Sequence, residues 1–222
     1  MPELTDLDYL ALGFYAASWF GYALFADHSR WRARSIMKRM DDHREQWMLQ
    51  MLRRDNRMVD ANIISSLQNG AAFFASTTIF ALGGLIAALG ASAQAVGILK
   101  TLPLVQAGTE ETWRLKVLLL IVILAYAFFK FAWTFRLQNY CSVLLGATPV
   151  DTEEGPENRA LAARHFNRAL RAYFFALAAL AWFLHPLLFI GTNLYVLYVL
   201  HRREFRSRSL KVLEDGGDAS QG

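Results

Sequence analysis

The residues from Trp113 to Ala132 form one long apolar run with only three charged side chains, Arg114, Lys116 and Lys130. A helix needs about 20 mainly apolar residues to cross the hydrocarbon of a bilayer, so this run predicts a membrane-spanning helix. Three further segments are similarly apolar, and the chain is 55% hydrophobic over 222 residues. We therefore expect an all-α integral membrane protein with about four spans, near 9–26, 63–89, 113–135 and 172–200.

Four spans leave room only for connecting loops, so residues 1–213 are expected to form a single membrane domain. Residues 214–222 are small and polar and are predicted to be a disordered tail. The net charge of +4 does not point to nucleic acid, because its basic residues adjoin apolar segments, where anionic lipid headgroups attract them. Cys141 is the only cysteine, which excludes an intrachain disulfide.

The basic residues predict how the chain crosses the membrane. Short loops rich in Lys and Arg stay in the cytoplasm, so the loop at 27–61, with its nine basic residues, is expected inside and the N-terminus outside. The expected location is a bacterial inner membrane. Four crossings then leave a basic C-terminal tail outside, against the same rule. A re-entrant hairpin at 172–200, broken at His185 and Pro186, would return the tail to the inside. Its arms would each be shorter than about 15 residues, so a single Pro-kinked span is the favoured prediction.

The segment between the first two spans has a helical pattern near 30–61. Its apolar residues recur at steps of four and seven, which places them on one face of a helix. These residues are Ile36, Met40, Trp47, Met51 and Met58. We expect a cytoplasmic, basic amphipathic helix that runs on into the second span. Its candidate residues for binding lipid or a partner are Arg53, Arg54 and Arg57.

Polar side chains within or near the spans are candidate functional or packing residues. Positions 62, 65, 66, 69 and 76 share one helical face, so Asn62 and Asn69 are expected to hydrogen-bond to neighbouring helices. Lys130 is expected to extend its amine toward the inner leaflet, and His185 suits either a hydrogen-bonded bend or a proton-sensitive gate. At the inner interface, Arg136 and Asn139 would cap lipid phosphates or pair with Asp55 or Asp60. The other candidate there is Asn56.

A pattern of residues extends from the segment before the second span to the fourth apolar segment: Trp47, Met51, Arg54, Asp55, Asn56, Ser66, Leu67, Asn69, Arg136, Asn139, Thr148 and Pro149, followed by the stretch from Arg168 to Pro186. In this pattern the chain resembles the family catalogued as domain of unknown function 599, whose members occur in plants and bacteria. One departure is Gln68, where the family pattern has Arg. The resemblance implies a four-span membrane protein and supplies no activity.

Three functions compete on these observations. The first is an accessory or structural subunit that binds anionic lipid, a larger membrane complex or further copies of itself. The second is a small oligomeric transporter or channel whose polar stripe from Asn62 to Thr78 faces Lys130, His185 and Asn193. The third is an enzyme acting on lipid headgroups, although no catalytic constellation or metal site is evident and an enzyme is the less favoured class. The sequence indicates no particular cofactor.

Overall fold

The computed structural model describes residues 4–28, 35–101, 108–147 and 171–205, and every regular element in these ranges is helical. In chain order these are α1 (Asp6–His28), α2 (Ile36–Leu52), α3 (Met58–Gly90), α4 (Ser92–Lys100), α5 (Glu110–Ala147), a helix over Arg171–Phe183, and α7 (Pro186–Phe205). The last turn of the helix Arg171–Phe183 is the 3-10 segment η2 (Ala181–Phe183).

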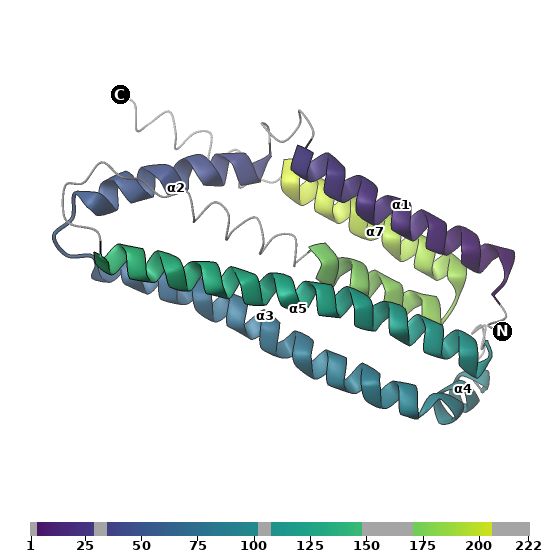
Figure 1. Ribbon diagram of the computed structural model, residues 1–222. Coiled ribbons are helices and arrows are strands. Elements are labelled where there is room, and N and C mark those ends of the chain that lie inside the picture. The colour runs from purple at the N-terminus through teal and green to yellow at the C-terminus, as the bar shows by residue number, and fades with distance from the viewer. Residues whose placement is uncertain (1–3, 29–34, 102–107, 148–170, 206–222) are drawn as a thin grey trace.

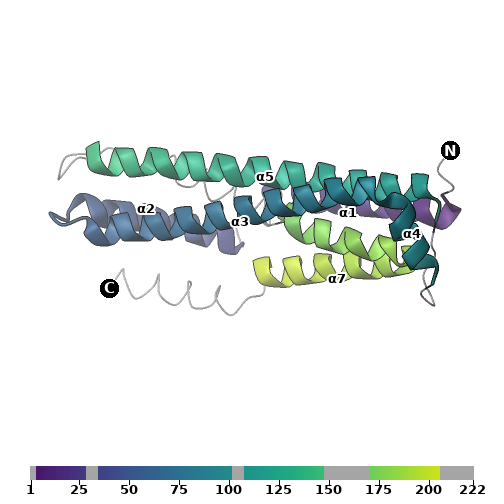
Figure 2. The ribbon, with the colours of Figure 1, turned by 90° about the horizontal axis from the view of Figure 1, so that it is seen from below.

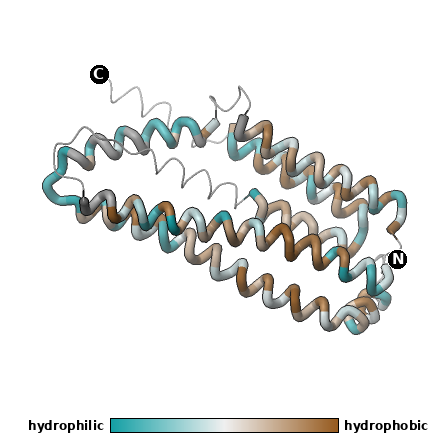
Figure 3. The backbone as a smooth tube through the Cα atoms, in the orientation of Figure 1, coloured by the Kyte–Doolittle hydropathy of each residue, from teal (hydrophilic) through white to brown (hydrophobic). Residues whose placement is uncertain are grey.

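Three of these helices are long and apolar enough to cross a membrane, which indicates a membrane protein. The apolar stretches are Asp6–Ala26, Met58–Gly90 and Glu110–Val143, and Arg171–Phe183 is a shorter apolar helix. Hydrophobic residues dominate the bundle of these helices, whereas α2 is mainly hydrophilic (Figure 3).

The helices run side by side in an elongated bundle (Figures 1 and 2). α3 and α5 form an antiparallel hairpin: Phe74 stacks on Phe131 at 5.3 Å between ring centroids, and the Trp113 indole donates to the Ala88 carbonyl over 3.2 Å. α1, Arg171–Phe183 and α7 lie together along one part of this hairpin (Figure 1). α2 instead follows the far part of α3 and α5.

The segment at 172–200 differs from the favoured prediction of one kinked helix. Arg171–Phe183 and α7 are two antiparallel helices, because the Thr192 hydroxyl lies 3.2 Å from the Ala178 carbonyl and Trp182 stacks on Phe189 at 5.5 Å. The chain reverses at Leu184 and His185, as the less favoured prediction of a hairpin requires. The physical reason is that Pro186 opens α7 instead of interrupting a helix: a proline at the first helical position forfeits no hydrogen bond there.

The main core lies where α1, α5, Arg171–Phe183 and α7 meet. Tyr15, Phe175, Trp182 and Phe189 are buried there, and the Tyr15 hydroxyl donates to the Phe175 carbonyl over 3.1 Å. Phe25 near the end of α1 contacts Phe205 at the end of α7, so α1 and α7 run parallel.

The bundle therefore has two ends, which we name by one residue each. The Asp8 end holds the start of α1, α4, the start of α5 and the reversal at 184–185. The Arg54 end holds the turn at 53–57 and the end of α5. α7 runs toward the Arg54 end but stops part-way along α5, level with the end of α1 (Figures 1 and 2).

Candidate functional site

The corner between α2 and α3 is built around Asp60, which is completely buried. Asp60 Oδ1 accepts hydrogen bonds from Trp47 Nε1 over 2.6 Å and from Arg54 Nη1 over 3.1 Å. The Asn56 side chain accepts from the Met58 backbone N–H over 3.0 Å and so forms a turn immediately before α3, whose N-cap is Arg57. These contacts lie where α2 has ended at Leu52 and the chain turns into α3, so the continuous helix expected over 30–61 is wrong in its bounds.

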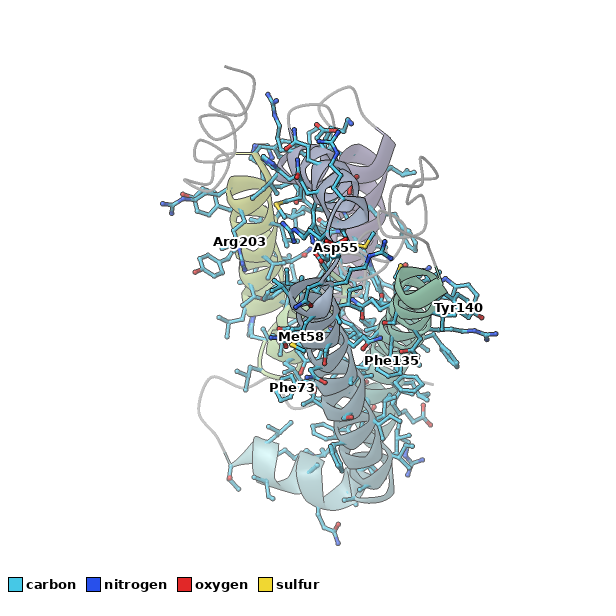
Figure 4. The ribbon with its side chains drawn as sticks, turned by 90° about the vertical axis from the view of Figure 1, so that its left-hand side faces the viewer. Asp55, Met58, Phe73, Phe135, Tyr140 and Arg203 are labelled. Carbon is cyan, nitrogen blue, oxygen red and sulfur yellow. The ribbon has the colours of Figure 1, made fainter. Side chains whose placement is uncertain are left out.

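The same corner decides which candidate side chains reach solvent. Arg53 and Asp55 are exposed, and 46% of the Arg54 side chain is exposed although it pairs with Asp60. Arg57 is half-buried. Figure 4, which views this end of the bundle, shows Asp55 at the turn. The structure therefore places Asn56 in the turn before α3 and leaves Arg53 and part of Arg54 available on the surface.

The polar residues of α3 lie on two different faces. Gln68 Nε2 donates to Asn139 Oδ1 over 2.8 Å and to Ser142 Oγ over 3.0 Å, which joins α3 to α5. Asn62 and Asn69 are exposed, and so are the serines at 65, 66 and 76. The two asparagine side chains make no hydrogen bond within the described part of the chain. The expectation that this stripe faces neighbouring helices is wrong for the described protomer, because α5 packs on the opposite face of α3.

The cationic candidates of α5 associate with aromatic rings. Arg136 Nε donates to the Tyr140 hydroxyl over 2.6 Å, and its guanidinium also lies 5.7 Å from the centre of the Trp133 ring. The Lys130 amine lies 5.3 Å from the centre of the Tyr126 ring. Cation–π contacts of this kind hold a charged head against an apolar surface. Asp60 takes Arg54 as its partner, so the suggested pairing of Arg136 with Asp60 is not formed.

His185 belongs to the reversal at the Asp8 end. Its Nδ1 accepts from the Leu187 backbone N–H over 3.1 Å, and its carbonyl accepts from the Phe189 N–H over 3.1 Å. His185 therefore caps α7 immediately before Pro186. Asn62 is near the Arg54 end, so within one chain His185 lies far from the start of the polar stripe of α3.

With this geometry described, comparison with known proteins decides the family. The family model "Protein of unknown function, DUF599" matches residues 10–209. The chain belongs to the DUF599 family. Searches of curated proteins and of solved structures find no match. The positions that carry the DUF599 resemblance include Trp47, Arg54 and Asn56, and here they form the corner between α2 and α3.

A second polar cluster in this DUF599 protein escaped sequence reasoning. Asp8 and Lys116 are both 6% exposed, and Trp182 between them is 1% exposed. Trp182 Nε1 donates to Asp8 Oδ1 over 2.7 Å, and Lys116 Nζ donates to the Trp182 carbonyl over 2.7 Å. Thr5 donates to Asp8 Oδ2 through both its N–H and its hydroxyl. A lysine inside an apolar run was the available signal, but nothing in the sequence named its partners.

The charges differ between the two ends. Exposed basic side chains in the part of the bundle toward the Arg54 end come from the turn at 53–57, from α5 and from the end of α7, and they include Arg53, Arg136, Arg202 and Arg203. At the Asp8 end Lys116 is buried, and the exposed basic side chains are Lys100 and Arg114, which pairs with Glu110 at 3.2 Å. Among the described residues no cluster of His, Cys, Asp or Glu could hold a metal ion. The exposed cationic side chains toward the Arg54 end can therefore bind anionic groups.

Proposed function

We propose that this protein is an accessory membrane protein whose Arg54 end binds the anionic headgroups of the cytoplasmic leaflet and so presents α2 and the turn at 53–57 to a membrane partner. The observation that carries the proposal is that exposed arginines from three separate elements lie in the part of the apolar bundle toward the Arg54 end. Figure 4 looks along the bundle from this end and shows Asp55 at the turn, Tyr140 on α5, and Arg203 on α7, which ends farther back along the bundle (Figures 1 and 2).

The lengths of α3 and α5 support a surface at headgroup level. At 1.5 Å per residue, the 33 residues of α3 span about 50 Å and the 38 residues of α5 about 57 Å. Even a tilt of about 40° leaves both longer than the roughly 30 Å of hydrocarbon. The apolar helices α1, Arg171–Phe183 and α7 flank the Asp8 side of this hairpin, so the excess length falls at the Arg54 end (Figure 1).

The side chains next to the turn also suit a membrane interface. Met58 and Val59 are 75% and 62% exposed and directly follow the arginines at 53, 54 and 57. A surface that combines exposed basic and apolar groups binds anionic bilayers through charge and through shallow insertion. Asp60 supports this surface from within, because it fixes Arg54 without removing its exposed part from solvent.

The orientation proposed from charge is more consistent with the hairpin at 184–185 than with four full crossings. The hairpin points the basic end of α7 toward the same side as Arg53, so Arg202 and Arg203 no longer conflict with the rule that basic loops stay inside. We accordingly propose that the Arg54 end is cytoplasmic and the Asp8 end is external, in the inner membrane of a bacterium.

The test is lipid binding by the purified protein in mixed micelles of phosphatidylglycerol and phosphatidylcholine, with bound lipids counted by native mass spectrometry. Each basic residue near an anionic surface contributes about 1 kcal/mol, so Arg53→Glu is expected to weaken phosphatidylglycerol binding roughly fivefold or more. Lys100→Glu makes the same charge change on an exposed residue at the Asp8 end and is expected to leave binding unchanged.

Equal losses in the two variants would show that only net charge matters and would overturn the assignment of the Arg54 end. Binding that is unaffected by Arg53→Glu would overturn it as well. Arg53 is the preferred position because it makes no contact with Asp60, so the corner between α2 and α3 stays intact.

A further inference from the structure

The outer face of α3 has a residue pattern typical of packed helices, but no helix in the described part of the chain covers it. Counting in sevens along this face gives Asn62, Asn69, Ser76, Gly83 and Gly90, and the interleaved positions are Ser66, Phe73, Phe80 and Ala87. Spacings of three and four that sum to seven form the seam of a left-handed helix pair. All nine side-chain positions are exposed. We call them the outer seam.

The opposite face of α3 carries a seam of the same period that is packed against the rest of the chain. Ile64, Ala71 and Thr78 follow the same period of seven and are buried against the rest of the chain, where α5 is the main neighbour of α3. The two seams are offset by two residues, or about 200° around the helix, so α3 can pack on α5 and on a second helix at once. In the most apolar window of α3 only 6% of residues are buried, against 39% in α5.

The composition of the outer seam differs from that of the positions beside it. The exposed flank positions on either side of the seam carry large apolar side chains, namely Ile63, Leu67, Ile79 and Ile86. The outer seam instead combines two amides, two hydroxyls and two glycines with an alanine and the rings of Phe73 and Phe80. A glycine within a helix costs about 1 kcal/mol relative to alanine. No atom lies within 4 Å of a Cβ built at Gly83 or Gly90, so contacts within the described chain do not require these glycines.

We propose that the outer seam is the interface with a second, parallel copy of this chain. Two copies inserted by the same rules have the same orientation in the membrane, so a twofold axis along the seam brings each residue against its own counterpart. Such an axis excludes charge, because a charged residue would meet its like, and none of the nine seam residues is charged.

The polar members of the seam fit this symmetry. An asparagine amide both donates and accepts, so Asn62 and Asn69 can each hydrogen-bond to the same residue of the second copy. Further along, the rings of Phe73 and Phe80 alternate with Ser76 and Gly83, which leaves space on each helix for the aromatic side chains of the other. A partner of different sequence would need none of this self-complementarity. The inference does not depend on lipid binding at the Arg54 end.

Disulfide crosslinking in native membranes tests the proposal. In a Cys141→Ser background, single cysteines are placed on the seam as Ser76→Cys and Gly83→Cys, and on the flank as Ile79→Cys and Ile86→Cys. Each flank position lies three residues from a seam position, so depth and access to oxidant are matched. Disulfides require Cβ atoms about 3.8 Å apart. Oxidation is expected to give a product of twice the 25.1 kDa chain mass for the seam variants and background levels for the flank variants.

The other outcomes overturn the inference. Absence of crosslinks means that lipid covers the seam, a product of another mass means a different protein, and equal yields at seam and flank mean random collision. A second measurement keeps the test independent of disulfide chemistry. Gly83→Leu is expected to convert dimers to monomers in nanodiscs, whereas Gly13→Leu, the same change at an open position on α1, leaves the mass unchanged. A Gly83→Leu protein that stays dimeric also overturns it.

Discussion

Trp182 and Asp8 are joined by a hydrogen bond of 2.7 Å between the indole nitrogen and the carboxylate, although they are 174 positions apart in the chain. Lys116 donates to the carbonyl of the same tryptophan over 2.7 Å and lies 4.9 Å from the centre of its ring. The start of α1, the start of α5 and the reversal before α7 are therefore fastened at one point. Breaking this point is expected to loosen the whole Asp8 end.

Asp8→Asn is expected to lower the free energy of unfolding by about 1–3 kcal/mol. The amide still accepts from Trp182 through its oxygen, but its NH₂ group meets the Thr5 N–H, which can only donate, and the Thr5 hydroxyl, which must turn to accept. Lys116 also loses the nearby negative charge. The measurement is reversible unfolding in mixed micelles. Asp6→Asn is the matched control, because Asp6 is an exposed carboxylate on the same helix and its change is expected to stay within about 0.5 kcal/mol.

Lys116→Met is expected to be destabilising by itself and less so when combined with Asp8→Asn. Methionine keeps most of the side-chain volume but leaves the buried Trp182 carbonyl without its donor and Asp8 without the neighbouring cation. Residues that share one network give interaction energies of about 0.5–3 kcal/mol in double-mutant cycles. Unfolding of the two single variants and the double variant measures this energy. Strictly additive losses would show that Asp8 and Lys116 act independently.

The helical architecture and the family could be predicted because both are local. The apolar stretch ending near Ala132 and the pattern around Trp47 are read from neighbouring residues, and helices cover these segments as expected. The reversal at 184–185 was harder, because a proline inside an apolar segment suits both a kink and a first helical position. The apolar segment ends at Leu200, so the arm after Pro186 also looks too short to cross the membrane. α7 in fact continues past Leu200 through His201 to Phe205, because the residues after Leu200 are polar but do not end the helix.

The polar contacts were less predictable, because a helical face does not name its neighbour. The period of Asn62 and Asn69 shows that they share a face, but their exposure depends on which side of α3 receives α5. Asp60 was proposed as a partner for Arg136 from depth alone. The partner is Arg54, six residues away, because the turn at 53–57 folds it back onto α3. Contacts such as that of Asp8 with Trp182 depend entirely on tertiary packing.

Asp60→Asn is expected to open the corner between α2 and α3. The neutral side chain still accepts from Trp47 but loses the ionic hydrogen bond from Arg54, which typically contributes about 1.5–3 kcal/mol. The expected result is faster trypsin cleavage at 53–57, because this turn contains three arginines and no longer holds its place on α3. Asp55→Asn changes an exposed carboxylate in the same turn and is expected to keep the wild-type rate. Similar acceleration in both variants would show that charge in the turn, rather than Asp60, controls cleavage.

The reversal at 184–185 gives a sharp prediction about the sides of the membrane. In a Cys141→Ser background, Arg53→Cys marks the Arg54 end, Arg203→Cys marks the end of α7 that points the same way, and Lys100→Cys marks the Asp8 end, all at exposed positions. A maleimide that cannot cross membranes is expected to label Lys100→Cys in intact cells, and the other two only after permeabilisation. Four full crossings would instead make Arg203→Cys react together with Lys100→Cys. Labelling of Arg53→Cys and Arg203→Cys from outside would keep the hairpin and reverse the orientation, against the distribution of basic residues.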